Sequence, residues 1–209
     1  KSYSIEKHYS GVENYFNDNY DIYKINGKNS FPLKERHSFE RYFAEFTLMV
    51  FYRTKSFRNL VMSLVEKQEN FEKVKNKDLN KKQSYLSNII ELTNKPMDIF
   101  PLFPESNLFF FKNKIVISDN PVILLDKNKR FMNNLKKDFL YDCYYMLLPI
   151  DEYTVFVLSR NEINKRFFCE KKFNSYQAKN SDKYIFSSEQ LILKNLRPQV
   201  KLKQKKPLY

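Results

Sequence analysis

The chain has 209 residues, of which 42% are hydrophobic and 17% aromatic, enough to bury a sizeable core and to exclude intrinsic disorder as its main state. Only two glycines are present, which excludes the glycine-rich phosphate loops of the Walker and dinucleotide-binding types. The formal net charge of +13 indicates a polyanionic partner, with nucleic acid the first candidate and an anionic membrane surface the competitor.

Two observations qualify this charge and suggest a compartment. The excess is mainly lysine in a chain also rich in Asn, Ile and Tyr, and A/T-rich coding can produce that bias without any function, so both explanations stay open. No apolar run approaches the roughly 18 residues of a membrane-spanning helix. Two cysteines without an evident partner, and no signal peptide at residues 1–10, favour a reducing, cytoplasmic location.

The first half of the chain has the three- to four-residue spacing of apolar side chains that is typical of helices. We expect a first helix over residues 3–18. Residues 34–70 are the most periodic stretch of the chain and predict one long helix at the centre of the fold. A third helix over residues 77–93 should end before Pro96, because the residue before a proline avoids the helical conformation.

The second half has the apolar runs and turn residues of β-structure. Residues 108–111 and 115–117 flank Lys112-Asn113-Lys114 and predict a hairpin. A second hairpin joins residues 139–148 to residues 153–158, and its continuous hydrophobicity predicts burial on both faces. The other elements expected here are a strand over residues 122–125, a helix near residues 170–180 and a short strand over residues 184–186.

Together these elements predict an α+β protein. A helical layer over residues 1–95 should pack on a mostly antiparallel sheet that spans residues 106–190, and a basic tail over residues 191–209 should follow. We expect a single compact unit rather than two independent domains. The tail carries cations without an acid, and these are the predicted nucleic-acid contacts: Lys194, Arg197, Lys201, Lys203, Lys205 and Lys206.

One charged residue falls within the apolar stripe of the predicted long helix. Turning 100° per residue places Arg53 beneath Phe46, so its guanidinium should point into the core and need an acid. The candidate partners are Glu13 and Asp119. A buried salt bridge that fixes helix packing and a catalytic or ligand-binding role both remain open. Arg58, some 120° away, is expected at the edge of the stripe as a ligand-binding candidate.

Polar residues and a proline separate two strand-like runs at Ser118-Asp119-Asn120-Pro121. A purely conformational turn explains them, because Asp and Asn side chains bond nearby backbone and Pro121 extends the residue before it. Alternatively, they leave a buried strand into a cleft, where Asp119 and Asn120 would act with Arg53 as catalytic residues and Ser118 would bind ligand.

Few other side chains suggest chemistry. Asn174 and Gln177 lie three residues apart on one side of a predicted helix and are further ligand-binding candidates. His8 and His37 are interpreted as surface residues, which makes a Ser-His-Asp triad implausible, and Cys143 is interpreted as a core residue. No metal site is predicted, because the histidines and cysteines are scattered singly. The cofactor, if there is one, is unknown.

Several of these segments resemble, in the same order, the mainly bacterial family called domain of unknown function 4238. The matching pieces are Glu13 within residues 11–14, the paired arginines of residues 53–58, the turn at residues 117–122, Leu148-Pro149 before a strand, and Gln177, Lys183 and Tyr184 near the end. Ser181 departs from the small apolar residue that the resemblance predicts, and the family's opening segment with a His and a nearby Pro is not found in the sequence. The resemblance implies the order of the elements and no reaction.

The sequence therefore leaves function hypotheses of different classes. The first is a protein that binds or acts on nucleic acid, such as a defence or toxin-like effector, with the tail on the phosphates. The second is a non-enzymatic protein-interaction module, in which Glu13, Arg53 and Asp119 form a structural network. The third is binding of a small ligand in the cleft beside the polar turn.

Overall fold

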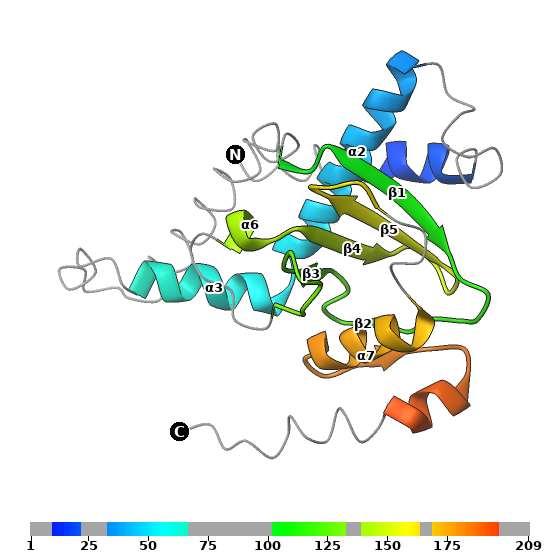
Figure 1. Cartoon of the computed structure of the whole chain (residues 1–209). Helices are drawn as coiled ribbons and strands as arrows, with labels where there is room; N and C mark the ends of the chain where they lie inside the picture. The colour runs from blue at the N-terminus through cyan, green and yellow to red at the C-terminus, as the bar shows by residue number, and fades with distance from the viewer. Residues whose placement is uncertain (1–9, 22–32, 67–101, 133–138, 164–168, 197–209) are drawn as a thin grey trace. The chain divides into compact units, whose positions relative to one another are not determined.

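The computed structural model describes residues 10–21, 33–66, 102–132, 139–163 and 169–196 (Figure 1). The side chains of residues 33–39 and 61–66 lie outside this description. The chain divides into two compact units, residues 1–53 with 61–102 and residues 54–60 with 103–209. Helices and a mostly antiparallel sheet confirm the predicted α+β class.

The first unit contains a helix over residues 10–21 and the whole of helix α2 (Leu33–Tyr52). Aromatic rings join the two, because the Phe16 ring lies 4.5 Å from that of Phe43 and 4.4 Å from that of Phe46. Tyr15 likewise stacks on Tyr42 at 4.0 Å. A helix was correctly expected here from the apolar spacing, although it continues to residue 21 rather than 18 and residues 3–9 of the prediction lie outside the described residues. Its packing uses rings that recur every three to four residues.

The prediction of one long helix over residues 34–70 is wrong. Helix α2 ends at Tyr52, and a separate helix, α3 (Lys55–Glu66), begins three residues later. Thr54 causes the interruption: its side-chain oxygen accepts the Phe57 backbone N–H at 3.3 Å, the bond of an N-cap residue. The hydrophobic periodicity continues across the break, so Thr54 is the sequence feature that indicates where the new helix begins.

The second unit is built on a four-stranded antiparallel sheet in the order β1-β5-β4-β3. Its strands are β1 (Glu105–Phe110), β3 (Ile123–Leu125), β4 (Tyr145–Pro149) and β5 (Thr154–Ser159). Every residue of β3, β4 and β5 is buried, which confirms the predicted β4–β5 hairpin and its burial on both faces. Residues Phe139–Asp142, expected to continue β4, form the short helix α6 instead.

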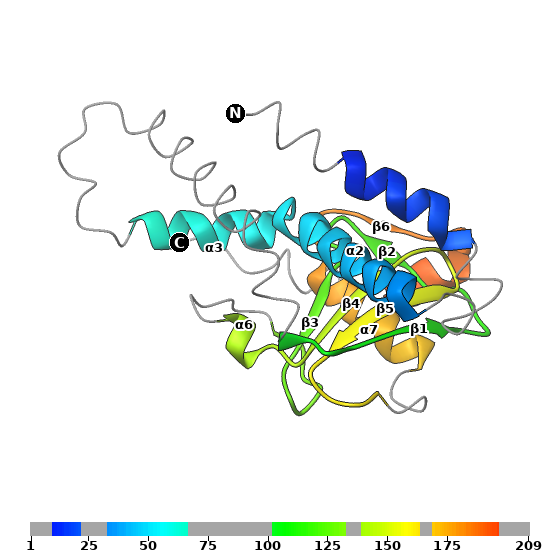
Figure 2. The same ribbon diagram turned by 90° about the horizontal axis from the view of Figure 1, so that it is seen from above.

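Helix α7 (Glu170–Asn180) confirms the helix expected near residues 170–180. Its Phe173 and Tyr176 side chains share one hydrophobic cluster with inward residues of the sheet. The turned view of Figure 2 accordingly shows α7 overlapping β4 and β5. The helix therefore packs its apolar side on the large sheet and leaves other side chains for a second contact.

That second contact is a small sheet, in which β2 (Ile117–Ser118) pairs antiparallel with β6 (Ile185–Phe186). The predicted hairpin between residues 108–111 and 115–117 is therefore wrong: β1 pairs with β5 over six residues, and β2 pairs with β6. The Phe111 and Ile115 N–H groups donate to carbonyls of the β4–β5 connection rather than to each other. Strand β1 pairs with β5, which is distant in the sequence, and the spacing of nearby residues cannot indicate such a pairing.

Other predictions fall outside the described residues, among them the helix over residues 77–93 and the tail beyond residue 196. A helix over residues 190–196 precedes that point and carries Lys194. None of the helices in the described part of the chain combines the length and apolarity needed to cross a bilayer.

Candidate functional site

The polar face of α7 binds the chain that leads into the Ser118–Pro121 turn. Asn174 accepts the Val116 N–H through its Oδ1 at 2.9 Å. One turn further, Gln177 accepts the Ser118 N–H through Oε1 at 3.1 Å and donates from Nε2 to the Pro121 carbonyl at 2.7 Å. The predicted pair therefore does lie on one side of a helix. Its two side chains supply hydrogen-bond partners to backbone groups of residues 116–121 that would otherwise be buried without partners.

The Ser118 hydroxyl is held between two acceptors. It lies 2.7 Å from Gln177 Oε1 and 2.8 Å from the Asn120 carbonyl. A hydroxyl has one proton, so it donates to one of these oxygens at a time. Ser118 is only 3% exposed and Gln177 is fully buried, which makes this hydroxyl a poor candidate for contact with a ligand.

The Asp119 carboxylate binds the turn that follows α7. One oxygen accepts the Asp182 N–H at 2.8 Å, and the other accepts the Lys183 N–H at 2.8 Å and the Tyr184 N–H at 3.3 Å. The Asp119 N–H completes the contact by donating to the Tyr184 carbonyl at 3.1 Å. Charge-assisted bonds of this kind are stronger than neutral ones, so Asp119 fixes the start of β6.

Asn120 connects the same turn to two further segments. Its Oδ1 accepts the Lys55 N–H at the first turn of α3, at 3.2 Å, and its Nδ2 donates to the Asn180 carbonyl at 3.1 Å. The Asn180 side chain returns a bond to the Asn120 carbonyl and another, at 2.8 Å, to that of Val122. Asn120 is 4% exposed, and both the oxygen and the nitrogen of its side-chain amide form hydrogen bonds.

An ion pair closes the cluster at its outer side. The Lys55 ammonium lies 2.9 Å from both oxygens of the Asp182 carboxylate. The Asp182 N–H is in turn bound by Asp119. The three residues of the Ser118-Asp119-Asn120 turn thus connect α3 and α7 to the small sheet and hold β6 at its start, which supports the conformational interpretation of this motif. A catalytic role for Asp119 and Asn120 stays a prediction.

Arg53 is not buried, contrary to its prediction from helical phase. Its side chain is 54% exposed, because the buried face of α2 carries Phe43, Thr47 and Phe51, whereas Phe46, which set the phase of the prediction, is itself only half-buried. The choice of partner is nevertheless correct: Arg53 Nη1 lies 2.9 Å from Glu13 Oε1, and Glu13 is itself partly exposed. Arg58 is exposed, as an edge position requires.

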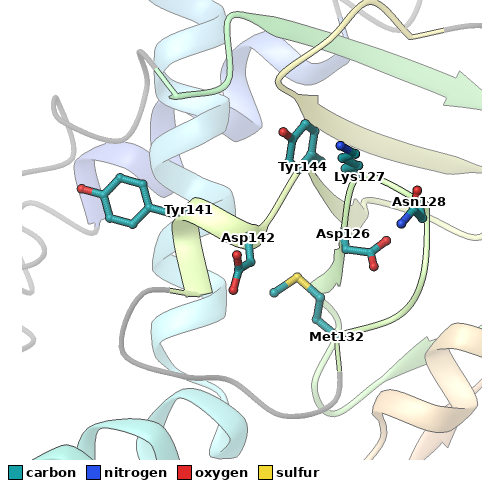
Figure 3. Close-up of a pocket in the computed structure, with 7 residues that line it drawn as sticks. All are labelled: Asp126, Lys127, Asn128, Met132, Tyr141, Asp142 and Tyr144. Atoms are coloured by element: carbon teal, nitrogen blue, oxygen red, sulfur yellow. The ribbon is translucent and has the colours of Figure 1, made fainter.

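The sequence analysis missed a pocket of about 600 Å³ beside α6 and the turn after β3. Its lining is polar and aromatic: Asp126, Lys127, Asn128, Met132, Tyr141, Asp142 and Tyr144. Figure 3 shows the Asp142 carboxylate facing Met132, whereas that of Asp126 points the other way, toward Asn128. The Asp126 Oδ1 also accepts the Arg130 N–H at 2.8 Å, which closes a hairpin turn. A turn-forming Asp-Lys-Asn run was the only sequence signal.

The pocket does not resemble a metal centre. Its two carboxylates diverge, and the described residues contain no group of three or more His, Cys, Asp or Glu side chains that could hold an ion. Cys143 lies nearby in the chain but is fully buried, and burial raises its pKa to about 12, so the thiol stays protonated and unreactive. The prediction of a core cysteine is confirmed.

Acidic and basic side chains differ in how they are used in the second unit. Six of the acids accept hydrogen bonds or pair with a lysine inside the fold: Asp119, Asp126, Asp151, Glu152, Glu170 and Asp182. Lysines at the surface have no carboxylate partner within the described ranges: Lys127, Lys171, Lys179, Lys183 and Lys194. Four exposed acids, Glu105, Asp142, Glu162 and Glu189, offset part of this charge, and the exposed lysines remain open to an anionic partner.

A family model described as protein of unknown function (DUF4238) matches residues 1–190 of the chain. No curated protein matches it, and no solved structure matches it. The match covers the first unit, the second unit up to residue 190 and the whole Ser118–Pro121 turn.

Proposed function

The chain belongs to this family of proteins of unknown function, and we propose that it binds nucleic acid. The observation that carries the proposal is the positive charge of the chain, +13 overall, together with five exposed lysines that lack carboxylate partners within the described part of the second unit. Phosphates supply the partner that such lysines lack, and binding them releases counterions.

The sequence beyond α7 supports the same proposal. From Lys194 to the end at Tyr209 it contains six basic residues and no acid. A segment of this composition gains binding energy mainly from phosphate contacts, without reading the base sequence. The proposed activity is therefore binding whose affinity depends on salt more than on sequence.

The bonding of the polar turn favours binding over catalysis. Asp119 and Asn120, the two candidates in the turn, use their side chains to hold backbone of the same unit. A general base or nucleophile needs an acceptor that is open to a substrate. We therefore propose a binding protein with a structural polar turn, which joins the nucleic-acid hypothesis to that of a non-enzymatic module.

A salt titration tests the proposal. Binding of a labelled 20-base-pair duplex should weaken with salt, and log affinity should fall against log salt by about 0.9 for each phosphate neutralised. Replacing Lys201, Lys203, Lys205 and Lys206 with Gln should flatten that slope. The matched control changes Lys73, Lys75, Lys81 and Lys82 to Gln, with the same loss of net charge from +13 to +9.

The outcomes separate local contacts from the overall field. A flatter slope for the tail variant alone supports phosphate contacts by the tail. Equal effects of both variants mean that only net charge matters, and the tail's role is refuted. Absence of binding to duplex or single strands at about 20 mM salt refutes the proposed function itself.

A further inference from the structure

Two aromatic side chains lie exposed and next to each other at strand β6: Phe186 is in the strand, and Tyr184 is the residue directly before it but one. Tyr184 is 60% exposed and Phe186 is 59% exposed, although each ring would gain by burial. Their ring centroids are 6.3 Å apart and the rings are inclined by 34°, so neither ring covers the other. More than half of each side chain is therefore open to a planar partner.

The strand alternation explains why these rings face outward. Ile185 packs into the cluster of Val116, Ala178 and Leu196, on the side of the small sheet that α7 covers. Its pairing partner Ser118 likewise points to Gln177 of α7. Side chains alternate along a strand, so Tyr184 and Phe186 project from the opposite face.

The aromatic pair is held rigidly by the polar turn. Asp119 accepts the Tyr184 N–H and donates its own N–H to the Tyr184 carbonyl. Phe186 pairs with Ile117 in the small sheet, next to Ser118 and its contact with Gln177. A fixed platform loses little conformational freedom when it binds, which is an advantage for a stacking surface.

Positive charge adjoins the pair. Lys183, exposed and without a carboxylate partner in the described ranges, directly precedes Tyr184. Near the other end, Ser188 lies 2.9 Å from the Lys114 ammonium, which is 5.7 Å from the centre of the partly exposed Tyr153 ring. Lys114 is paired with the Glu152 carboxylate at 2.9 Å, so in the described part of the chain Lys183 supplies the uncompensated positive charge beside the rings.

From this geometry we propose that Tyr184 and Phe186 form a stacking platform for the unpaired bases of single-stranded nucleic acid. Adjacent aromatic rings flanked by lysines are the combination that binds single strands, since every base has a face that stacks and every nucleotide a phosphate. A base-paired duplex hides the faces of its bases within the stack. The inference rests on the proposed function and assigns it a substrate class.

The test compares single and double strands in the full chain. Fluorescence anisotropy with labelled 20-nucleotide poly(dT) and a 20-base-pair duplex is measured for the wild type, Tyr184→Ala, Phe186→Ala and the double variant. Each alanine should weaken single-strand binding by about fivefold to 100-fold and leave duplex binding within about twofold. Tyr184→Phe should retain single-strand affinity, because stacking needs the ring and not the hydroxyl.

Tyr141→Ala is the matched control, since Tyr141 is 68% exposed and lies on α6, outside the platform. It should change neither affinity. Unaltered single-strand binding by the double variant refutes the platform while the proposed function stands; an apolar protein partner would then be the better occupant. A parallel loss of both affinities, with an unchanged melting temperature, also refutes it. No binding by the wild type refutes the proposed function and this inference together.

Discussion

Gln177→Ala should be among the most destabilising single substitutions in the second unit. Gln177 is fully buried, and its amide satisfies the Ser118 N–H and the Pro121 carbonyl while offering an acceptor to the Ser118 hydroxyl. The hydroxyl keeps the Asn120 carbonyl as an alternative acceptor, so two backbone groups lose their partner. Each buried group left unsatisfied costs about 1–3 kcal/mol, which gives a loss of about 2–6 kcal/mol in the free energy of unfolding.

Two further variants separate hydrogen bonds from packing. Gln177→Met keeps most of the side-chain volume without polar atoms, so most of the loss should persist. Asn174→Ala removes one bond, to the Val116 N–H, and should cost about 1–3 kcal/mol. Lys179→Ala, an exposed position on the same helix, is the control and should stay within about 0.5 kcal/mol of the wild type.

Urea unfolding followed by circular dichroism and by tyrosine fluorescence measures these differences. The chain has two compact units, and separate unfolding of the two would give different transitions for the two probes. The free energies are therefore compared only where both probes give the same transition. If Gln177→Ala lost less than about 1 kcal/mol, or if Gln177→Met restored wild-type stability, the polar face of α7 would not hold the turn by hydrogen bonds. The structural interpretation of Ser118–Pro121 would then fail.

Three further predictions follow from local chemistry. Thr54→Ala removes the N-cap of α3 and should lower the free energy of unfolding by about 1 kcal/mol in the same assay, whereas Thr54→Ser should retain it. Native protein should react with a thiol reagent at pH 8 at the exposed Cys169 alone, and at Cys143 only after unfolding; a second fast thiol in the native state would contradict this. Hydrogen bonds from Ser188 and Lys114 lower the pKa of Glu152 in the folded protein. The carboxylate therefore stabilises the fold fully above its unfolded pKa, and this stabilisation is lost as the pH falls through its folded pKa. Ser188→Ala should raise the folded pKa of Glu152 in an NMR titration, and an unchanged pKa would refute the bond.

The elements that were predicted correctly depend on local patterns. Strands β4 and β5 are apolar runs joined by a short turn, and helix α7 follows from its spacing. The hairpin around Lys112–Lys114 failed because strand pairing is decided between distant segments. Glu170 of α7 accepts the Lys112 and Asn113 N–H groups at 3.2 and 3.4 Å, and this contact is absent from any local window.

Arg53 shows how one local error changes an energetic argument. Centring the apolar stripe on Phe46 placed the guanidinium in the core, where breaking its ion pair would cost about 3–5 kcal/mol. The buried face of α2 carries Phe43, Thr47 and Phe51 instead, so the same pair with Glu13 lies at a half-exposed surface. Such pairs contribute about 0–1 kcal/mol. The partner was predictable from charge, but the burial was not, because the apolar spacing did not identify which face of α2 is buried.

The polar turn was the most distinctive motif of the sequence, and its bonding gives that distinctiveness a physical cause. Asp119, Asn120 and Gln177 each satisfy buried or ordered backbone from a segment more than 50 positions away, so a change of residue type would leave several groups unpaired. This demand restricts residue type as strongly as catalysis would. The substrate-facing chemistry should then lie where side chains remain open, and Tyr184 and Phe186 stand directly on the strand that Asp119 holds. A motif can therefore serve a binding surface without touching the ligand.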